Sequence, residues 1–112
     1  MDYALQVLYV DLSARTARQA RLDTDTSSRY LGGRGIAAYF LSRNPTVRPL
    51  DQEAPLIFAT GALTGSRIPA AGRMIIAAFS PLTDTLCSCS VGGSPARELR
   101  RAGIDTIVIT GR

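Results

Sequence analysis

The sequence predicts an α+β domain of five to six strands and two to three short helices. Three observations predict it. Short apolar runs recur along the chain, two other stretches carry helical spacing or helix-capping residues, and turn residues separate these segments. A chain of 112 residues corresponds to one domain at most, and its hydrophobic fraction of 46% is that of a folded globular chain.

The first third of the chain predicts a β-hairpin and then a helix. Residues 4–12 alternate as a strand with apolar side chains on both faces, so we expect each face to be partly covered. Residues 13–16 form a turn, and the polar residues 17–22 return as an edge strand. The run Asp23–Ser27 is rich in N-cap residues, which predicts a helix from there through residues 28–31.

A glycine-rich segment, Gly32-Gly33-Arg34-Gly35, follows that helix. Three glycines in four residues weaken a helix, so we expect a break there and a second helix over residues 36–43 that ends at Asn44-Pro45. No strand leads into the segment, so it is not a dinucleotide-binding fingerprint. Two interpretations stay open: the glycines clamp an anion or form a hinge, or they allow a close helix crossing.

The pattern in the middle of the chain predicts three strands and no helix. Cys87 and Cys89 alternate along the last of them, and we expect two small buried apolar residues there rather than metal ligands. The small-residue segment Gly61–Gly72 is either a ligand-facing loop or a structural connection. The predicted strands are residues 56–60, 73–79 and 85–90, with a proline-rich loop over 44–55, an irregular segment over 61–69 and a turn over 80–84.

The clearest local pattern follows the third of these strands. Gly92-Gly93 leads into a helix with Ser94 at the N-cap, Pro95 at the first helical position and Gly103 as the stop; a final strand spans 104–110. Glycines before a helix N-terminus allow close backbone approach and favour a phosphate. Arg73, at the start of the neighbouring predicted strand, could supply the charge. The alternative is a tight strand-to-helix turn.

The composition excludes several classes of chemistry. The chain has no His and no Lys, so it holds no Ser-His-Asp triad, no His-ligated zinc, no Schiff-base lysine and no P-loop lysine. Two Cys are too few for the four thiolates of an iron–sulfur cluster. We therefore expect neither catalytic residues nor metal ligands within this chain. A cofactor or another stretch of protein would bring the reactive groups.

The net charge of +4 comes from 13 arginines. It indicates either an anionic partner or a codon bias toward arginine. Basic and aromatic residues do not interleave as in nucleic-acid binders, so we expect no nucleic-acid partner. No apolar run approaches about 18 residues and no basic segment precedes an apolar one, so we expect neither membrane insertion nor secretion, and a cytoplasmic location.

Read in order, several segments resemble the N-terminal region of the tungsten-containing aldehyde ferredoxin oxidoreductase family. The resemblance covers almost all of the chain, and the combination of pieces is more specific than any one of them. The segments are VLYVDLSARTARQARLD, YLGGRGIAAYFL, PTVRPLDQEAPLIFATGALTGSRIPAAGR, FSPLT and GGSPARELRRAGIDTIVITGR. Residues 1–112 would then be a partial N-terminal cofactor-binding domain, the first of two similar β-rich halves.

The resemblance implies a site for a bis-pterin cofactor holding tungsten or molybdenum, with magnesium bridging the pterin phosphates. The family's cofactor-contacting arginine falls on Arg73 and its glycine loop on Gly92 and Gly93. Ser90 stands where many members have Asn, whose backbone carbonyl helps to hold the magnesium. The cysteines of the family's iron–sulfur cluster lie beyond this chain and are not Cys87 or Cys89.

The resemblance also implies a function for the longer enzyme: oxidation of an aldehyde to a carboxylate, with electrons passed to ferredoxin. The chain alone would be inactive, and its partner would be the rest of the enzyme chain. The alternative is a standalone, non-catalytic assembly module that pairs with a second copy. Because the chain ends directly after a strand, at Thr110-Gly111-Arg112, we expect a fragment or a truncated product.

Overall fold

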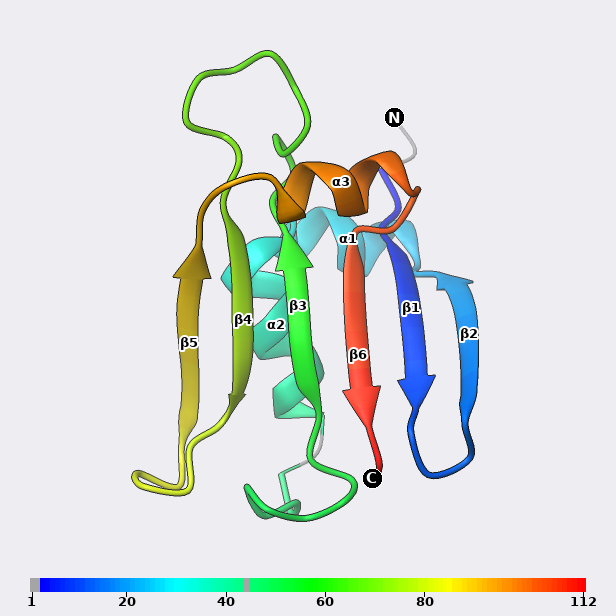
Figure 1. Ribbon diagram of the computed structural model, residues 1–112, viewed down its shortest axis with the longest axis vertical. Coiled ribbons are helices and arrows are strands. Elements are labelled where there is room, and N and C mark those ends of the chain that lie inside the picture. The colour runs from blue at the N-terminus through cyan, green and yellow to red at the C-terminus, as the bar shows by residue number, and fades with distance from the viewer. Residues whose placement is uncertain (1–2, 44) are drawn as a thin grey trace.

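A computed structural model describes residues 3–43 and 45–112, which form one mixed six-stranded sheet with three helices (Figure 1). The strand order is β2-β1-β6-β3-β4-β5. The β1–β6 pair is parallel and the other pairs are antiparallel. In chain order the elements are β1 (Gln6–Asp11), β2 (Thr16–Arg21), α1 (Thr24–Tyr30), α2 (Gly33–Ser42), β3 (Leu56–Thr60), β4 (Met74–Phe79), β5 (Leu86–Val91), α3 (Pro95–Arg101) and β6 (Thr106–Thr110).

This architecture confirms the predicted α+β class and the predicted numbers of strands and helices. Every predicted strand is present, with bounds that differ by no more than two residues. The polar strand β2 lies at a sheet edge, as expected, and most of its residues are exposed. Within the described residues, no helix is long and apolar enough to span a lipid bilayer.

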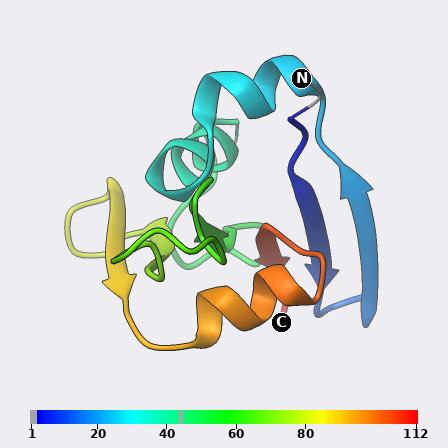
Figure 2. The same cartoon turned by 90° about the horizontal axis from the view of Figure 1, so that it is seen from above.

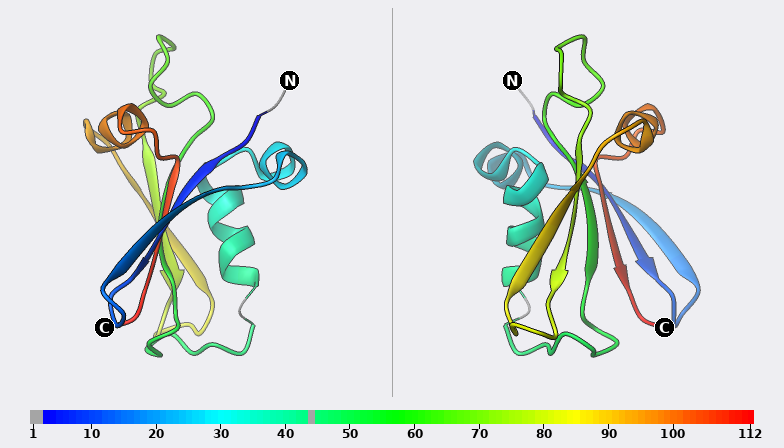
Figure 3. Two further views of the ribbon diagram at one scale, coloured as in Figure 1. Left: turned by 90° about the vertical axis from the view of Figure 1, so that its right-hand side faces the viewer. Right: turned by 60° about the vertical axis from the view of Figure 1, so that its left-hand side comes forward.

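One face of the sheet packs against α1 and α2 (Figures 2 and 3). The buried stripe of α2 consists of Ile36, Ala37, Phe40 and Leu41, whose spacing places them on one side of the helix. They meet alternate residues of the strands, because successive strand residues point to opposite faces. The buried strand-side and N-terminal members of this core are Leu5, Val7, Ile57, Ala59, Ala77 and Val108.

Glycines bring α1 and α2 into close contact with neighbouring backbone. A Cβ atom at Gly35 would lie 2.5 Å from the Tyr30 carbonyl oxygen, and one at Gly32, where φ is +130°, would lie 2.7 Å from the Thr60 carbonyl oxygen. The structure therefore supports the close-crossing interpretation of this segment. The predicted start of the second helix at Ile36 was wrong: α2 begins at Gly33, because tertiary contact outweighs the low helix propensity of glycine.

The other face of the sheet carries α3 at one end only (Figure 3). Strand alternation and register place a continuous set of apolar residues on it, which we call the open face. Its members are Leu8, Val10, Leu56, Phe58, Ile76, Ala78, Ile107 and Ile109, together with Cys87 and Cys89. The expected burial of both cysteines was wrong: they are exposed free thiols, because β5 is an edge strand and no element covers them.

Candidate anion-binding site

The four residues selected from the sequence lie at one corner of the sheet. Arg73 directly precedes β4, and Gly92 directly follows β5. Met74 pairs with Val91 in the antiparallel β4–β5 ladder. The residue before Met74, Arg73, therefore lies beside the residue after Val91, Gly92. Ser90 is the next residue inward on β5, and Gly93 leads on to α3. The structure thus brings together Arg73, Ser90, Gly92 and Gly93.

The Arg73 side chain is held against the end of β5. Its Nη1 donates a hydrogen bond to the Ser90 hydroxyl oxygen at 3.2 Å. Arg73 is exposed and makes no ion pair with any described residue. A guanidinium has five N–H donors, so one bond to a neutral hydroxyl leaves its charge and most of its donors available. Such a group can bind a carboxylate or phosphate through two parallel hydrogen bonds.

Gly92 keeps the space beside this guanidinium free. A Cβ atom at Gly92 would lie 3.7 Å from Arg73 Nη2, in van der Waals contact, so a longer side chain would occupy the surface next to the arginine. Gly93 has a φ of +89°, a conformation that side-chain-bearing residues rarely adopt. The two glycines therefore have different physical roles: Gly92 leaves room for a ligand, and Gly93 turns the chain.

The helix after this turn matches most of the predicted pattern. Pro95 occupies the first turn of α3, and Gly103 follows the C-cap with a φ of +82°. Ser94 is at the N-cap position, but its side chain makes no capping hydrogen bond. The expected Ser94 side-chain cap is therefore absent, and the N-terminal N–H groups of α3 are not satisfied by this hydroxyl.

The loop between β3 and β4 borders the corner. One side of it forms a groove of about 600 Å³ whose lining is mainly apolar, including Leu31, Leu63 and Ile68, and which ends at Arg73. The other side forms a cleft of about 250 Å³ with Gly93 and Arg97. This arrangement favours the ligand-facing interpretation of the Gly61–Gly72 segment, because both hollows adjoin the predicted site.

Two further arginines at this end of the molecule were not selected from the sequence. Arg34, in the first turn of α2, donates from Nε to the Ser88 hydroxyl at 3.2 Å. Ser88 and Ser90 point to the same face of β5, so Arg34 and Arg73 bind successive serines along one edge. The alternation of Ser88 and Ser90 in the segment TLCSCS was the sequence signal that could have indicated two hydroxyl groups on one face of this strand. Arg97 lines the cleft beside Gly93, and its place near the start of α3 was the available signal.

Comparison with known proteins identifies the fold and its family. Residues 7–112 match the family described as "Aldehyde ferredoxin oxidoreductase, N-terminal domain". The chain belongs to this family. It is 37% identical over 109 residues to the tungsten-containing aldehyde ferredoxin oxidoreductase of Pyrococcus horikoshii, covering 96% of this chain and 18% of that protein. The Pyrococcus furiosus enzyme is 39% identical over 105 residues, covering 92% of this chain and 17% of that protein.

A solved structure shows the same architecture as this aldehyde ferredoxin oxidoreductase N-terminal domain. It is the active site complex BamBC of benzoyl coenzyme A reductase in complex with 1,5-dienoyl-CoA, with a TM-score of 0.92 and 36% identity. The match covers 96% of this chain and 17% of that chain. The present chain thus spans less than a fifth of the relatives that it matches. Within its described residues, no group of three or more His, Cys, Asp or Glu side chains could hold a metal ion.

Proposed function

We propose that this chain is the N-terminal cofactor-binding part of an aldehyde ferredoxin oxidoreductase-type enzyme. The observation that carries the proposal is the exposed Arg73 guanidinium held beside Gly92, where the absence of a side chain leaves room for an anionic group. Membership of the family supports a phosphate-bearing pterin as that group. The activity would then belong to a longer protein, because the chain spans about 18% of the length of the relative from Pyrococcus horikoshii.

The residues at this corner fit the phosphate end of such a cofactor. Arg73 would donate to phosphate oxygens, and the backbone N–H groups at Gly92 and Gly93 can approach a ligand closely. The Ser90 backbone carbonyl oxygen would be a ligand for the magnesium ion that accompanies the phosphates. The adjacent groove, lined by Leu31, Leu63 and Ile68, would limit water around the bound group.

When bound, a tungsten or molybdenum bis-pterin group supplies the redox chemistry that converts an aldehyde to a carboxylate, with ferredoxin as electron acceptor. The part of this chain would be to bind and orient that group. The iron–sulfur cluster and its cysteine ligands would come from the remainder of the enzyme. The described residues of this chain need not supply a base or a nucleophile for this role.

An NMR titration with inorganic phosphate and pyrophosphate tests the corner directly. We expect saturable amide shifts at Gly92 and Gly93, with tighter binding of pyrophosphate. Arg73→Gln should weaken binding at least tenfold, about 1.4 kcal/mol, because it removes the charged donor pair. Arg48→Gln is the matched control, since Arg48 is also exposed but lies in the loop before β3. Equal affinity of wild type and Arg73→Gln would contradict the proposal.

A second candidate function is a non-catalytic assembly module that pairs with another copy. The open face favours it, because an uncovered apolar sheet surface is a site of association. Leu56 lies on this face, is 38% exposed and pairs with Ile109 in the β3–β6 ladder. Sedimentation equilibrium should show association of the wild-type chain and a monomer for Leu56→Lys. A wild-type monomer at high concentration would exclude self-pairing.

A further inference from the structure

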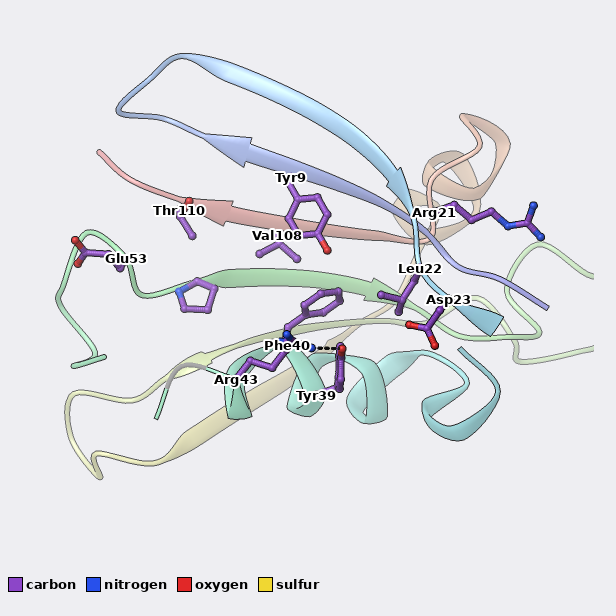
Figure 4. Close-up of a pocket in the computed structure, with 11 residues that line it drawn as sticks. Tyr9, Arg21, Leu22, Asp23, Tyr39, Phe40, Arg43, Glu53, Val108 and Thr110 are labelled. Atoms are coloured by element: carbon purple, nitrogen blue, oxygen red, sulfur yellow. Dashed lines mark hydrogen bonds between the residues drawn. The ribbon is translucent and has the colours of Figure 1, made fainter. Parts of the chain in front are cut away.

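A separate cavity of about 790 Å³ lies beside α2 on the face of the sheet that carries the core (Figure 4). It spans β1 and β6 and reaches the segment that precedes β3. Arg73 does not line it, so it is distinct from the corner described above. Its size falls within the range of about 300–1,000 Å³ that is typical of small-molecule sites.

The floor of this cavity is aromatic. Tyr9 and Phe40 meet edge to face, with ring centroids 6.1 Å apart and an interplanar angle of 85°. Tyr39 and Phe40 make a second such contact at 5.3 Å and 68°. Leu22, Pro55 and Val108 complete the apolar lining. A flat ring can therefore pack against the exposed parts of these side chains.

Positive charge borders the aromatic floor. Arg43 lies over the Tyr39 ring, with Cζ 5.4 Å from the centroid, and its Nη1 donates to the Tyr39 hydroxyl oxygen at 2.5 Å. Arg18 lies over the Tyr9 ring, with Cζ 4.6 Å from the centroid. Neither arginine forms an ion pair within the described part of the chain. Both guanidinium groups retain donors for an external anion.

The Tyr9 hydroxyl is a neutral polar group at this floor. It has no hydrogen-bond partner among the described residues, and Figure 4 shows it pointing toward the α2 side of the cavity. Burial raises the pKa of Tyr9, while the nearby charges of Arg18 and Arg43 act in the opposite direction and Tyr39 adds to the increase. The phenol therefore stays protonated at neutral pH and can donate one hydrogen bond.

The acidic residues of the cavity lie apart from this region. Glu53 lies at the end near Thr110, away from Tyr9 and Arg43 (Figure 4). Asp23 lies near Leu22, and its carboxylate accepts a hydrogen bond from the Thr26 amide. The two carboxylates thus lie at opposite ends of the cavity, and Arg43 lies between them, which favours an occupant with a single negative charge near the middle and disfavours a second anionic group at the end near Glu53.

We propose that this cavity binds a small aromatic monocarboxylate. The ring would lie against Phe40 and Tyr9, and the carboxylate would accept hydrogen bonds from Arg43 and the Tyr9 hydroxyl. This site is independent of the proposed cofactor function, since the two share no residue. Either one can fail without affecting the other.

NMR titration of the 112-residue chain with benzoate tests the proposal. We expect saturable shifts at Tyr9, Phe40 and Arg43, with an affinity in the millimolar range typical of small fragments. Benzamide has the same shape without the charge and should bind at least tenfold more weakly. Terephthalate, which carries a second carboxylate across the ring, should also bind more weakly because of Glu53. Equal binding of benzoate and benzamide, or no saturable shift, would overturn the proposal.

Variants distinguish binding in this cavity from a general effect of the chain's positive charge. Arg43→Met should lower benzoate affinity at least tenfold, and Tyr9→Phe about fivefold, the effect of one hydrogen bond. Arg101→Gln, on α3, is the charge-matched control and should bind benzoate as the wild type does. Far-UV circular dichroism checks that each variant folds. If a folded Arg43→Met chain binds benzoate as tightly as Arg101→Gln does, the assignment is wrong.

Discussion

The two faces of the sheet differ in how they are covered. On the face that meets α1 and α2, the strand residues Val7, Ile57 and Ala59 are completely buried. On the open face, Leu8, Ile76, Ile107 and their neighbours remain partly accessible although they are equally apolar, because α3 covers only one end. The strands thus carry apolar residues on both faces, but only one face forms a packed core, and the other remains an apolar surface that is partly exposed.

This difference indicates where the chain depends on other protein. The face with α1 and α2 needs only local helices, which follow β2 directly in the sequence. The open face would need a further layer, either from the remainder of a longer enzyme or from a second copy. The proposed cofactor corner lies at β5, which is an edge strand of the sheet. No further strand of the described residues pairs with β5 on its outer side.

The largest contrast should come from matched truncations on the two faces. Leu41→Ala, at a fully buried site, should lower the free energy of unfolding by about 2–5 kcal/mol, because it removes packed atoms and leaves a cavity. Ile107→Ala, on the open face, should cost less than half as much. Guanidinium denaturation measures both. Equal losses would mean that the open face is as well packed as the other.

Substitution of Gly35 should have the next largest effect. Its Cβ would lie 2.5 Å from the Tyr30 carbonyl oxygen, so Gly35→Ala must separate α1 from α2, at a cost of about 1–3 kcal/mol. Gly72→Ala is the control, since its Cβ would make an ordinary 3.8 Å contact. Urea denaturation compares the two variants. A neutral Gly35→Ala would show that the close crossing is not required.

A buried threonine offers a stabilising change on the covered face. Thr106 is completely buried, and within the described residues its hydroxyl has no hydrogen-bond partner. Thr106→Val should therefore raise the free energy of unfolding by about 1 kcal/mol. Thr60 is equally buried but donates to the Asp105 carbonyl oxygen at 2.8 Å, so Thr60→Val should destabilise the fold. Thermal unfolding should give opposite signs for the pair.

The smallest effect concerns pH and the start of α1. Hydrogen bonds from Thr26 hold the pKa of the Asp23 carboxyl below its ordinary value of 3.8. Because the pKa of Asp23 is lower in the folded state, its ionised carboxylate stabilises the fold. This stabilisation is complete above the unfolded-state pKa and is lost as the pH falls through the folded-state pKa. Thermal scans of wild type and Asp23→Asn should therefore converge only below about pH 4. A constant difference down to pH 2 would contradict this assignment.

Much of the fold could be predicted from local patterns. Strand positions followed from apolar alternation, and α3 from Pro95 and Gly103. The start of α2 at Gly33 could not be predicted, because it depends on backbone contact with residues far along the chain. The exposure of Cys87 and Cys89 depended on strand order, which brings β6 between β1 and β3 and leaves β5 at the edge.

The candidate anion-binding site could be predicted from the sequence insofar as it depends on the hairpin of β4 and β5. Arg73 and Gly92 flank paired positions of β4 and β5, so their proximity follows from antiparallel register. The Arg34–Ser88 contact and the Tyr9–Arg43 cavity join elements that are distant in sequence. Neither has a local signature, since each depends on how α2 packs against the sheet.

The most direct test of the functional account is the mass and metal content of this protein purified from its own cells. An antibody raised against the 112-residue chain allows both to be measured on the captured material. We predict a species several times heavier than 11.9 kDa that carries tungsten or molybdenum. A species of 11.9 kDa without either metal would contradict the enzyme assignment and favour the assembly module.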